Sequence, residues 1–408
     1  MTEQHNEATP DLRTVRIADF SRMIAGSHVT SLLAMFGAEV IKIESSLHPD
    51  SFRVTLQTGD DLNSSRQFEC FNRNKKSVSI DMSSERGREI AARLIKISDV
   101  VMENFSPGVM ERWGLDYPHL KKIKPDIIMC ILPGMGRKGP QSHYVTWGAN
   151  LLAYSGFTHL WDHPDSSEPV GVQIAFPDYI ASVEAAIAIM AALDYRARTG
   201  RGQFIEIAQI EGTMSMLPTS FLEYFVTGHE PAPRGNRSRH ASPCGCYPCR
   251  GEDRWCVITV STDTEWMRFR QAIGDPPWAR KERFATVPGR IRHADELDGL
   301  VAEWTCQHTP HEAMKILQES GIAAGAVQNA QDLFHDPHLR SRQMLWRTNH
   351  PKMAGLTFPG VPIKLSGSPG KIISHSPLLG QDNYSVFGEL LGMSPEEIED
   401  LCQQGVLI

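Results

Sequence analysis

The chain has 408 residues, of which 41% are hydrophobic, so it is long enough for two domains and a large core. Its formal net charge of −7 gives no general electrostatic case for binding nucleic acid or an anionic membrane surface. The first residues are polar, no run of about 18 apolar residues follows, and eight cysteines do not make a disulfide scaffold. We therefore expect a cytoplasmic protein with neither a membrane nor a nucleic-acid partner.

The N-terminal part of the chain alternates strands and helices. Residues 15–19 predict a short strand, a helix follows, and residues 39–44 predict a second strand. A strand, a helix and a strand within about 30 residues form a βαβ unit with two parallel strands. Further strands are expected at residues 78–81, 99–103 and 126–132. This alternation predicts an α/β fold with a Rossmann-like parallel sheet.

A glycine-rich turn follows the last of these strands. Residues 134–139, Gly-Met-Gly-Arg-Lys-Gly, match the spacing of a dinucleotide-binding motif. Pro140 and a polar run come next, so no helix N-terminus is placed to hold a pyrophosphate. We therefore do not expect a nicotinamide dinucleotide cofactor.

The stretch from Gly171 to Gln209 organises the rest of the chain. Pro177-Asp178 begins an amphipathic helix, which we expect to end at Gly200 and to be followed by a strand over residues 203–209. The helix has an apolar stripe, and alanines keep the rest of it narrow. The stripe consists of Ile180, Val183, Ile187 and Met190. Asp178 has two interpretations: a carboxylate that caps the helix, or a carboxylate nucleophile that forms a covalent acyl intermediate.

The chain beyond residue 210 predicts a helix over residues 211–226, a linker, and a smaller α+β region over residues 227–330. That region contains an expected strand at 254–260, helices near 263–273, 293–306 and 310–320, and a strand at 323–327. Thr309-Pro310-His311-Glu312 is a typical helix start, because the threonine caps and the glutamate lies three residues later.

Two segments carry a resemblance to a known family. Asp178, its alanine-rich helix and Thr-Gly-Arg-Gly-Gln at 199–203 resemble the active-site segment of the class III CoA-transferases, the formyl-CoA transferase and carnitine CoA-transferase type. Asn-Phe-Ser-Pro-Gly at 104–108 is similar to a turn that lines the CoA site of that family. The resemblance implies a large domain made of residues 1–226 and 331–408, a small domain of residues 227–330, and two chains interlocked as a dimer.

The resemblance also implies the chemistry. Asp178 is the implied catalytic residue, which attacks an acyl-CoA thioester and later carries CoA itself as an aspartyl thioester. The residues implied to bind CoA are Arg22, Met23, Ile24, Asn104, Phe105 and Arg112. Cationic side chains suit the phosphates of CoA, which is a substrate here, and no permanently bound cofactor is expected. Succinyl-CoA is the expected donor, and a benzylsuccinate-like carboxylic acid is the expected acceptor.

Three alternatives stay open beside this interpretation. The first is an acyl-CoA racemase, which shares the fold but usually has a histidine where this chain has Trp147. The second is a non-catalytic subunit that pairs with a homologous chain in a heteromer. The third is a metal site at Cys244, Cys246 and Cys249, whose spacing lacks the separated pairs of a structural zinc site, so we expect a loop of reduced thiols without a metal.

Overall fold

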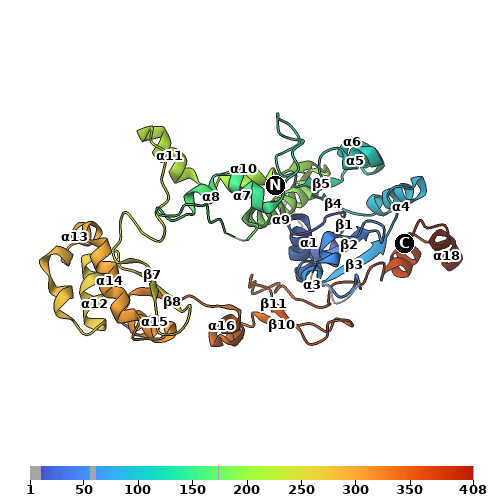
Figure 1. Ribbon diagram of the computed structural model, residues 1–408. Helices are drawn as coiled ribbons and strands as arrows, with labels where there is room; N and C mark the ends of the chain where they lie inside the picture. Colours follow the sequence, from blue (N-terminus) through green and yellow to red (C-terminus); the bar gives the residue numbers. More distant parts are fainter. Residues whose placement is uncertain (1–10, 56–60, 173, 408) are drawn as a thin grey trace, which may run out of the picture. The chain divides into compact units, whose positions relative to one another are not determined.

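The computed structural model describes residues 11–55, 61–172 and 174–407. Its backbone contacts divide the chain into two compact units (Figure 1). Unit 1 comprises Met1–Phe157, Val172–Gly228 and Leu339–Ile408, and unit 2 comprises Thr158–Gly171 and His229–His338. Each unit therefore collects segments that are separated in the sequence.

Unit 1 is built on a six-stranded parallel sheet in the order β3-β2-β1-β4-β5-β6. The strands are β1 (Arg16–Asp19), β2 (Glu39–Glu44), β3 (Lys75–Ser79), β4 (Val100–Glu103), β5 (Ile128–Ile131) and β6 (Phe204–Glu206). The strand order reverses between β1 and β4. In open α/β sheets, ligands bind at the carboxyl ends of the strands at such a reversal.

Helices cover both faces of this sheet. One face packs against α1 (Ala25–Met35) and α9 (Phe176–Thr199). The other face packs against α4 (Glu85–Lys96), α6 (Tyr117–Ile123), the π-helical η4 (Tyr384–Leu390) and α18 (Pro395–Gln403). The C-terminal helices η4 and α18 therefore belong to the same hydrophobic core as the N-terminal strands.

Shorter elements complete unit 1 and join it to unit 2. They are η1 (Leu12–Thr14), α2 (Ser51–Val54), α3 (Arg66–Asn72), α5 (Val109–Trp113), α7 (Gly148–Tyr154), α8 (Phe157–Leu160), α10 (Gln209–Met214), α11 (Pro218–Thr227), α17 (Pro337–Ser341), β10 (Leu345–Arg347) and β11 (Thr357–Pro359). The last two strands pair as an antiparallel hairpin.

Unit 2 has an antiparallel sheet of three strands, ordered β7-β8-β9, with helices packed on it. Its elements are β7 (Cys244–Pro248), β8 (Trp255–Thr259), α12 (Asp263–Ala272), η2 (Pro277–Arg280), η3 (Glu282–Phe284), α13 (Val287–Arg292), α14 (Ala294–Thr305), α15 (Pro310–Glu319), β9 (Ala323–Ala326) and α16 (Ala330–His335). In its core Trp266 stacks on Phe269 and meets Phe284 edge to face. The capping box of Thr309 and Glu312 is confirmed at the start of α15.

The α/β class, the parallel sheet and the boundaries of β2 are confirmed, and three local expectations are wrong. β3 begins at Lys75, three residues earlier than expected, because that lysine pairs with a buried carboxylate. The single helix expected over residues 211–226 is two helices, since Pro218 starts a new one. The cysteine-rich segment expected to be a loop is the strand β7.

Helix α9 ends at Gly200 in the left-handed conformation, as predicted, but its expected apolar stripe does not face the core. Val183, Ile187 and Met190 are 49%, 58% and 45% exposed, whereas the alanine face is buried against α1 and the sheet. Alanine residues occupy the buried face of α9 because their small side chains let two helices approach closely. By length and composition, α9 also passes the test for a membrane span, a test that buried core helices pass as well.

Candidate active site

The loops after β1 and β4 are joined at the reversal of strand order. The backbone N–H of Arg22 donates to Asn104 Oδ1 at 2.8 Å, and Asn104 Nδ2 donates to the carbonyl of Arg22 at 2.8 Å. The Arg22 guanidinium also lies 5.8 Å from the ring centre of Phe105. Three of the residues predicted to bind CoA are therefore brought together by direct contacts, at the place where the fold favours a ligand.

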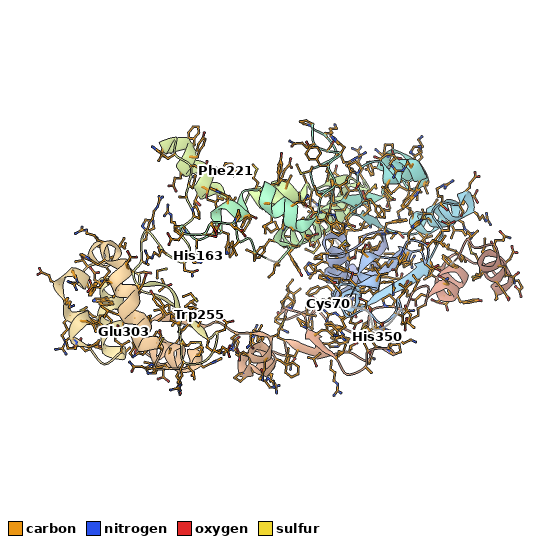
Figure 2. The ribbon with its side chains drawn as sticks, viewed as in Figure 1. Cys70, His163, Phe221, Trp255, Glu303 and His350 are labelled. Carbon is orange, nitrogen blue, oxygen red and sulfur yellow. The ribbon has the colours of Figure 1, made fainter. Side chains whose placement is uncertain are left out.

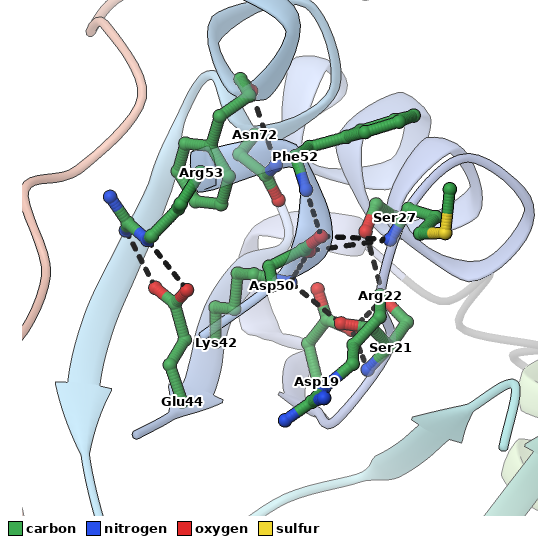
Figure 3. Close-up of polar contacts among 12 residues, drawn as sticks. Asp19, Ser21, Arg22, Ser27, Lys42, Glu44, Asp50, Phe52, Arg53 and Asn72 are labelled. Atoms are coloured by element: carbon green, nitrogen blue, oxygen red, sulfur yellow. Dashed lines mark hydrogen bonds and ion pairs between the residues drawn. The ribbon is translucent and has the colours of Figure 1, made fainter. Parts of the chain in front are cut away.

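A buried ionic network supports this loop from beneath (Figure 3). Lys42 Nζ lies 3.1 Å from an Asp50 carboxylate oxygen and donates to the carbonyl of Ser21 at 2.6 Å. Lys75 Nζ lies 3.0 Å from Asp19, and all four of these charged side chains are essentially inaccessible. Removing one member of such a pair leaves an uncompensated buried charge, which typically costs about 3–5 kcal/mol. The loop is therefore held rigidly.

Met23 and Ile24 occupy the middle of the loop. Met23 has a φ of +58°, which is a strained conformation for a side chain of this size. Its backbone N–H donates to the Asp50 carboxylate at 3.1 Å, and this bond holds the strained turn in place. Both residues pack against the aromatic cluster of Phe52, Phe68 and Phe71. The structure therefore places them in a constrained bend between Arg22 and the start of α1.

Asp178 lies in the first turn of α9, directly after Pro177. The backbone N–H groups of Ala25 and of Asp178 itself lie close enough to its carboxylate to favour the ionised form, although the Asp178 N–H donates to the carbonyl of Ala175 at 3.0 Å. The Ser182 hydroxyl contacts both the Ala25 carbonyl, at 2.8 Å, and the Asp178 carbonyl, and so ties the two helix ends together. On the other side, a Cβ added to Gly148 would come within 2.4 Å of Asp178 Oδ2, so only glycine fits there.

Burial raises the pKa of Asp178 to about 6, although the two backbone N–H groups act in the opposite direction. A helix N-terminus favours the ionised form of a carboxylate, and the loss of water on burial outweighs that effect at Asp178. The carboxylate is still mostly ionised at pH 7. A partly desolvated carboxylate with an accessible charged form is suited to act as a nucleophile or a base.

Arg112 lies on α5, after the turn that follows Asn104 and Phe105. It is exposed, and its Nη1 lies 3.3 Å from where a Cβ on Gly108 would be. Phe105 also lines a shallow recess, together with Glu103, Tyr117, Arg137 and Phe204 among others. Burial raises the pKa of Glu103 to about 8, so this carboxyl is largely neutral at pH 7.

The remaining predicted features fall in different places. The glycine-rich segment at 134–139 is not followed by a helix until Gly148, in agreement with its rejection as a dinucleotide motif. Trp147, at the position where a racemase would usually have histidine, is 57% exposed and immediately precedes Gly148. Within residues 11–55, 61–172 and 174–407, no three His, Cys, Asp or Glu side chains group closely enough to hold a metal ion.

Sequence reasoning missed several residues around Asp178. Lys75, one of two consecutive lysines, is buried. His28 of α1 contacts Tyr179, and Cys70 of α3 lies in unit 1 (Figure 2) with a thiol pKa raised by burial, which makes it a poor nucleophile. Of these residues, only His28 could have been found from the sequence, because it is the fourth residue of a helix that starts directly after the predicted CoA loop.

Known proteins resemble this chain over nearly its whole length. The model of CoA-transferase family III matches residues 12–383. The succinyl-CoA–D-citramalate CoA-transferase of Chloroflexus aurantiacus is 33% identical over 97% of this chain and 98% of the relative. The α-subunit of the succinyl-CoA–L-malate CoA-transferase of that species is 31% identical, over 97% of this chain and 92% of the subunit. A solved CAIB/BAIF family protein from Brucella suis superposes with a TM-score of 0.85 at 30% identity, covering 94% of this chain and all of that one.

Proposed function

Because the chain belongs to CoA-transferase family III, we propose that it moves CoA from a donor acyl-CoA to a carboxylic acid through a covalent thioester on Asp178. One observation carries the proposal: residues 22–25 connect the two halves of the site. Arg22 is hydrogen-bonded to Asn104 at the sheet reversal, and the carbonyl of Ala25, three residues later, accepts from the Ser182 hydroxyl, which also contacts the carbonyl of Asp178. A thioester held by the Arg22 loop therefore has its reactive end close to the carboxylate.

The proposed reaction needs no proton transfer. A carboxylate oxygen of Asp178 attacks the thioester carbonyl carbon, the C–S bond breaks, and CoA leaves as a thiolate. The thiolate attacks the Asp178 carbonyl of the resulting anhydride, which releases the donor acid as a carboxylate and leaves the aspartyl-CoA thioester. The acceptor carboxylate then reverses both steps. Splitting the transfer in this way keeps the thioester bond energy from being lost to water.

The binding of CoA is proposed along the loops that follow β1 and β4. Arg22 and the exposed Arg112 supply positive charge for its phosphates, and Met23, Ile24, Asn104 and Phe105 form the surface between them. No further cofactor takes part in the proposed reaction.

The acids are proposed to be succinyl-CoA as donor and a succinate-like acid as acceptor. The names of the two Chloroflexus relatives combine succinyl-CoA with D-citramalate and with L-malate. Benzylsuccinate, the acceptor suggested by the resemblance, is itself a substituted succinate and belongs to the same test panel. The reaction is proposed to take place in the cytoplasm.

A second chain is proposed to cover the apolar side of unit 1. Besides the stripe on α9, helix α11 exposes Phe221, Phe225 and Val226 at 50%, 86% and 71% (Phe221 is labelled in Figure 2). Apolar surface of this extent is typical of a protein interface. The partner is a second copy or a homologous subunit, as the name of the L-malate relative allows. Sedimentation should give twice the 45.5 kDa of one chain, and Phe225→Glu should reduce that mass.

The covalent step is tested by intact-protein mass spectrometry after mixing with succinyl-CoA and then hydroxylamine. We expect a hydroxamate at Asp178 that is absent from Asp178→Asn. No modification, together with exchange of the α-proton of a branched acyl-CoA in heavy water, would identify a racemase instead. If neither the hydroxamate nor the proton exchange is found, the chain is a non-catalytic subunit. A homologous chain should then co-purify with it.

A further inference from the structure

His28 lies in the wall around Asp178. It is on α1, three residues after Ala25, whose backbone N–H lies close to the Asp178 carboxylate, and residues three apart share one face of a helix. Its ring meets the ring of Tyr179, the residue after Asp178, with centres 5.3 Å apart at 74°. Phe71 closes another side, with its ring centre 6.1 Å from that of His28 at 86°. The imidazole is thus fixed by two edge-to-face contacts next to the nucleophile.

The two ring nitrogens of His28 differ in their surroundings. Nδ1 is buried and has no hydrogen-bond partner among the residues that the structure describes. Burial, with the positive charges of Lys75 and Arg73, lowers the pKa of His28 to about 4, so the ring is neutral at pH 7. A neutral imidazole has one N–H, and because no acceptor meets Nδ1 the proton belongs on Nε2.

The Nε2–H group is available to a ligand. His28 is only partly buried, and Nε2 does not share the burial of Nδ1. No hydrogen bond to the imidazole is found within the described part of the chain, whereas most polar atoms near a protein core are paired. A fixed donor is therefore left open next to the position of the acyl group.

The charges around this donor favour an anion. Arg73 is buried and makes its hydrogen bonds to the carbonyls of Pro359, at 2.8 Å, and Cys70, at 3.3 Å. Within the described residues no carboxylate lies within ion-pair distance of its guanidinium, and its Nε has no partner. Arg73 and Lys75 both act on His28, and because Lys75 is paired with Asp19 at 3.0 Å, the positive charge without a carboxylate partner is that of Arg73. A negative group beside the ring is stabilised by that charge.

We propose that His28 determines specificity by donating its Nε2–H to the second carboxylate of a short dicarboxylic acid bound at Asp178. The inference rests on the proposed transfer at Asp178 and names the acid class that this site takes. Phe71 and Tyr179 contact the carbon chain, and the positive charge of Arg73 favours the distal carboxylate. An acid of equal length with a methyl group at that end leaves the Nε2–H of His28 without a hydrogen-bond partner. Leaving a buried polar group of the site unpaired discriminates strongly between substrates.

The test compares two acceptors with five carbons each, glutarate and pentanoate, at saturating succinyl-CoA. In a ping-pong reaction the kcat/KM for the acceptor depends only on the second half-reaction. The distal carboxylate of the succinyl donor therefore does not affect the comparison of the two acceptors. His28→Phe keeps an aromatic ring in the cluster and removes the donor, whereas His28→Gln keeps an N–H donor. We expect the glutarate-to-pentanoate ratio to fall about 10- to 100-fold in His28→Phe, as for a hydrogen bond to a charged group, and to recover in His28→Gln.

An unchanged ratio in His28→Phe, or an equal loss in His28→Gln, would overturn the proposal. Should His28→Phe not fold, His28→Leu and His28→Gln form a second pair of similar length, and the same difference in ratio is expected between them. Failure of the proposed function is seen separately, because the wild-type protein would then form no hydroxamate at Asp178 and transfer CoA to neither acid.

Discussion

Replacing Asp178 with asparagine is expected to stabilise the protein while it abolishes transfer. Burial raises the pKa of Asp178 from 3.8 to about 6. At about 1.36 kcal/mol for each pH unit, the ionised carboxylate costs the folded state about 3 kcal/mol relative to the unfolded chain. Because the folded pKa is the higher one, this cost is absent below pH 3.8, grows between pH 3.8 and 6, and is complete above pH 6. Asparagine has no charge at any of these pH values.

Differential scanning calorimetry at fixed protein concentration measures this effect. With an unfolding entropy of about 2.1 cal/mol/K per residue over the whole chain, the gain is about 3–4 °C at pH 7.5 and about 1 °C at pH 4.5. Asp194→Asn is the matched control, since that carboxylate is exposed on the same helix. A lower melting temperature for Asp178→Asn at pH 7.5, or an offset that does not change with pH, would refute the argument from desolvation.

Three further predictions concern the neighbours of Asp178 and the CoA loop. Gly148→Ala forces a Cβ to within 2.4 Å of Asp178 Oδ2, so kcat should fall more than about 100-fold in steady-state assays, and a change below threefold would contradict the close approach. Lys75→Met leaves Asp19 buried without its cation and should lower the free energy of unfolding in urea by about 3–5 kcal/mol; the exposed Arg198→Met is the control. Asn104→Ala removes both hydrogen bonds to Arg22 and should raise the KM for acyl-CoA about tenfold, more than it lowers kcat, as measured by initial rates.

Much of the fold was readable from local patterns. The strand at 39–44, the βαβ unit and the end of α9 at Gly200 depend on hydrophobic spacing and on glycine chemistry, which act over a few residues. Asp178 was placed at a helix start for the same reason. Arg22 and Asn104 were each named from motifs, and the structure adds the two hydrogen bonds that join them.

The sequence by itself thus determined the α/β class, the order of elements and the identity of the candidate nucleophile. Only the tertiary structure decided which face of α9 is buried, that Lys75 pairs with Asp19 across the sheet, and that Gly148 and His28 surround Asp178. These facts depend on segments up to about 150 residues apart meeting in space. Burial and charge then set the pKa of Asp178, because desolvation is a property of the packed site and of no single residue in the chain.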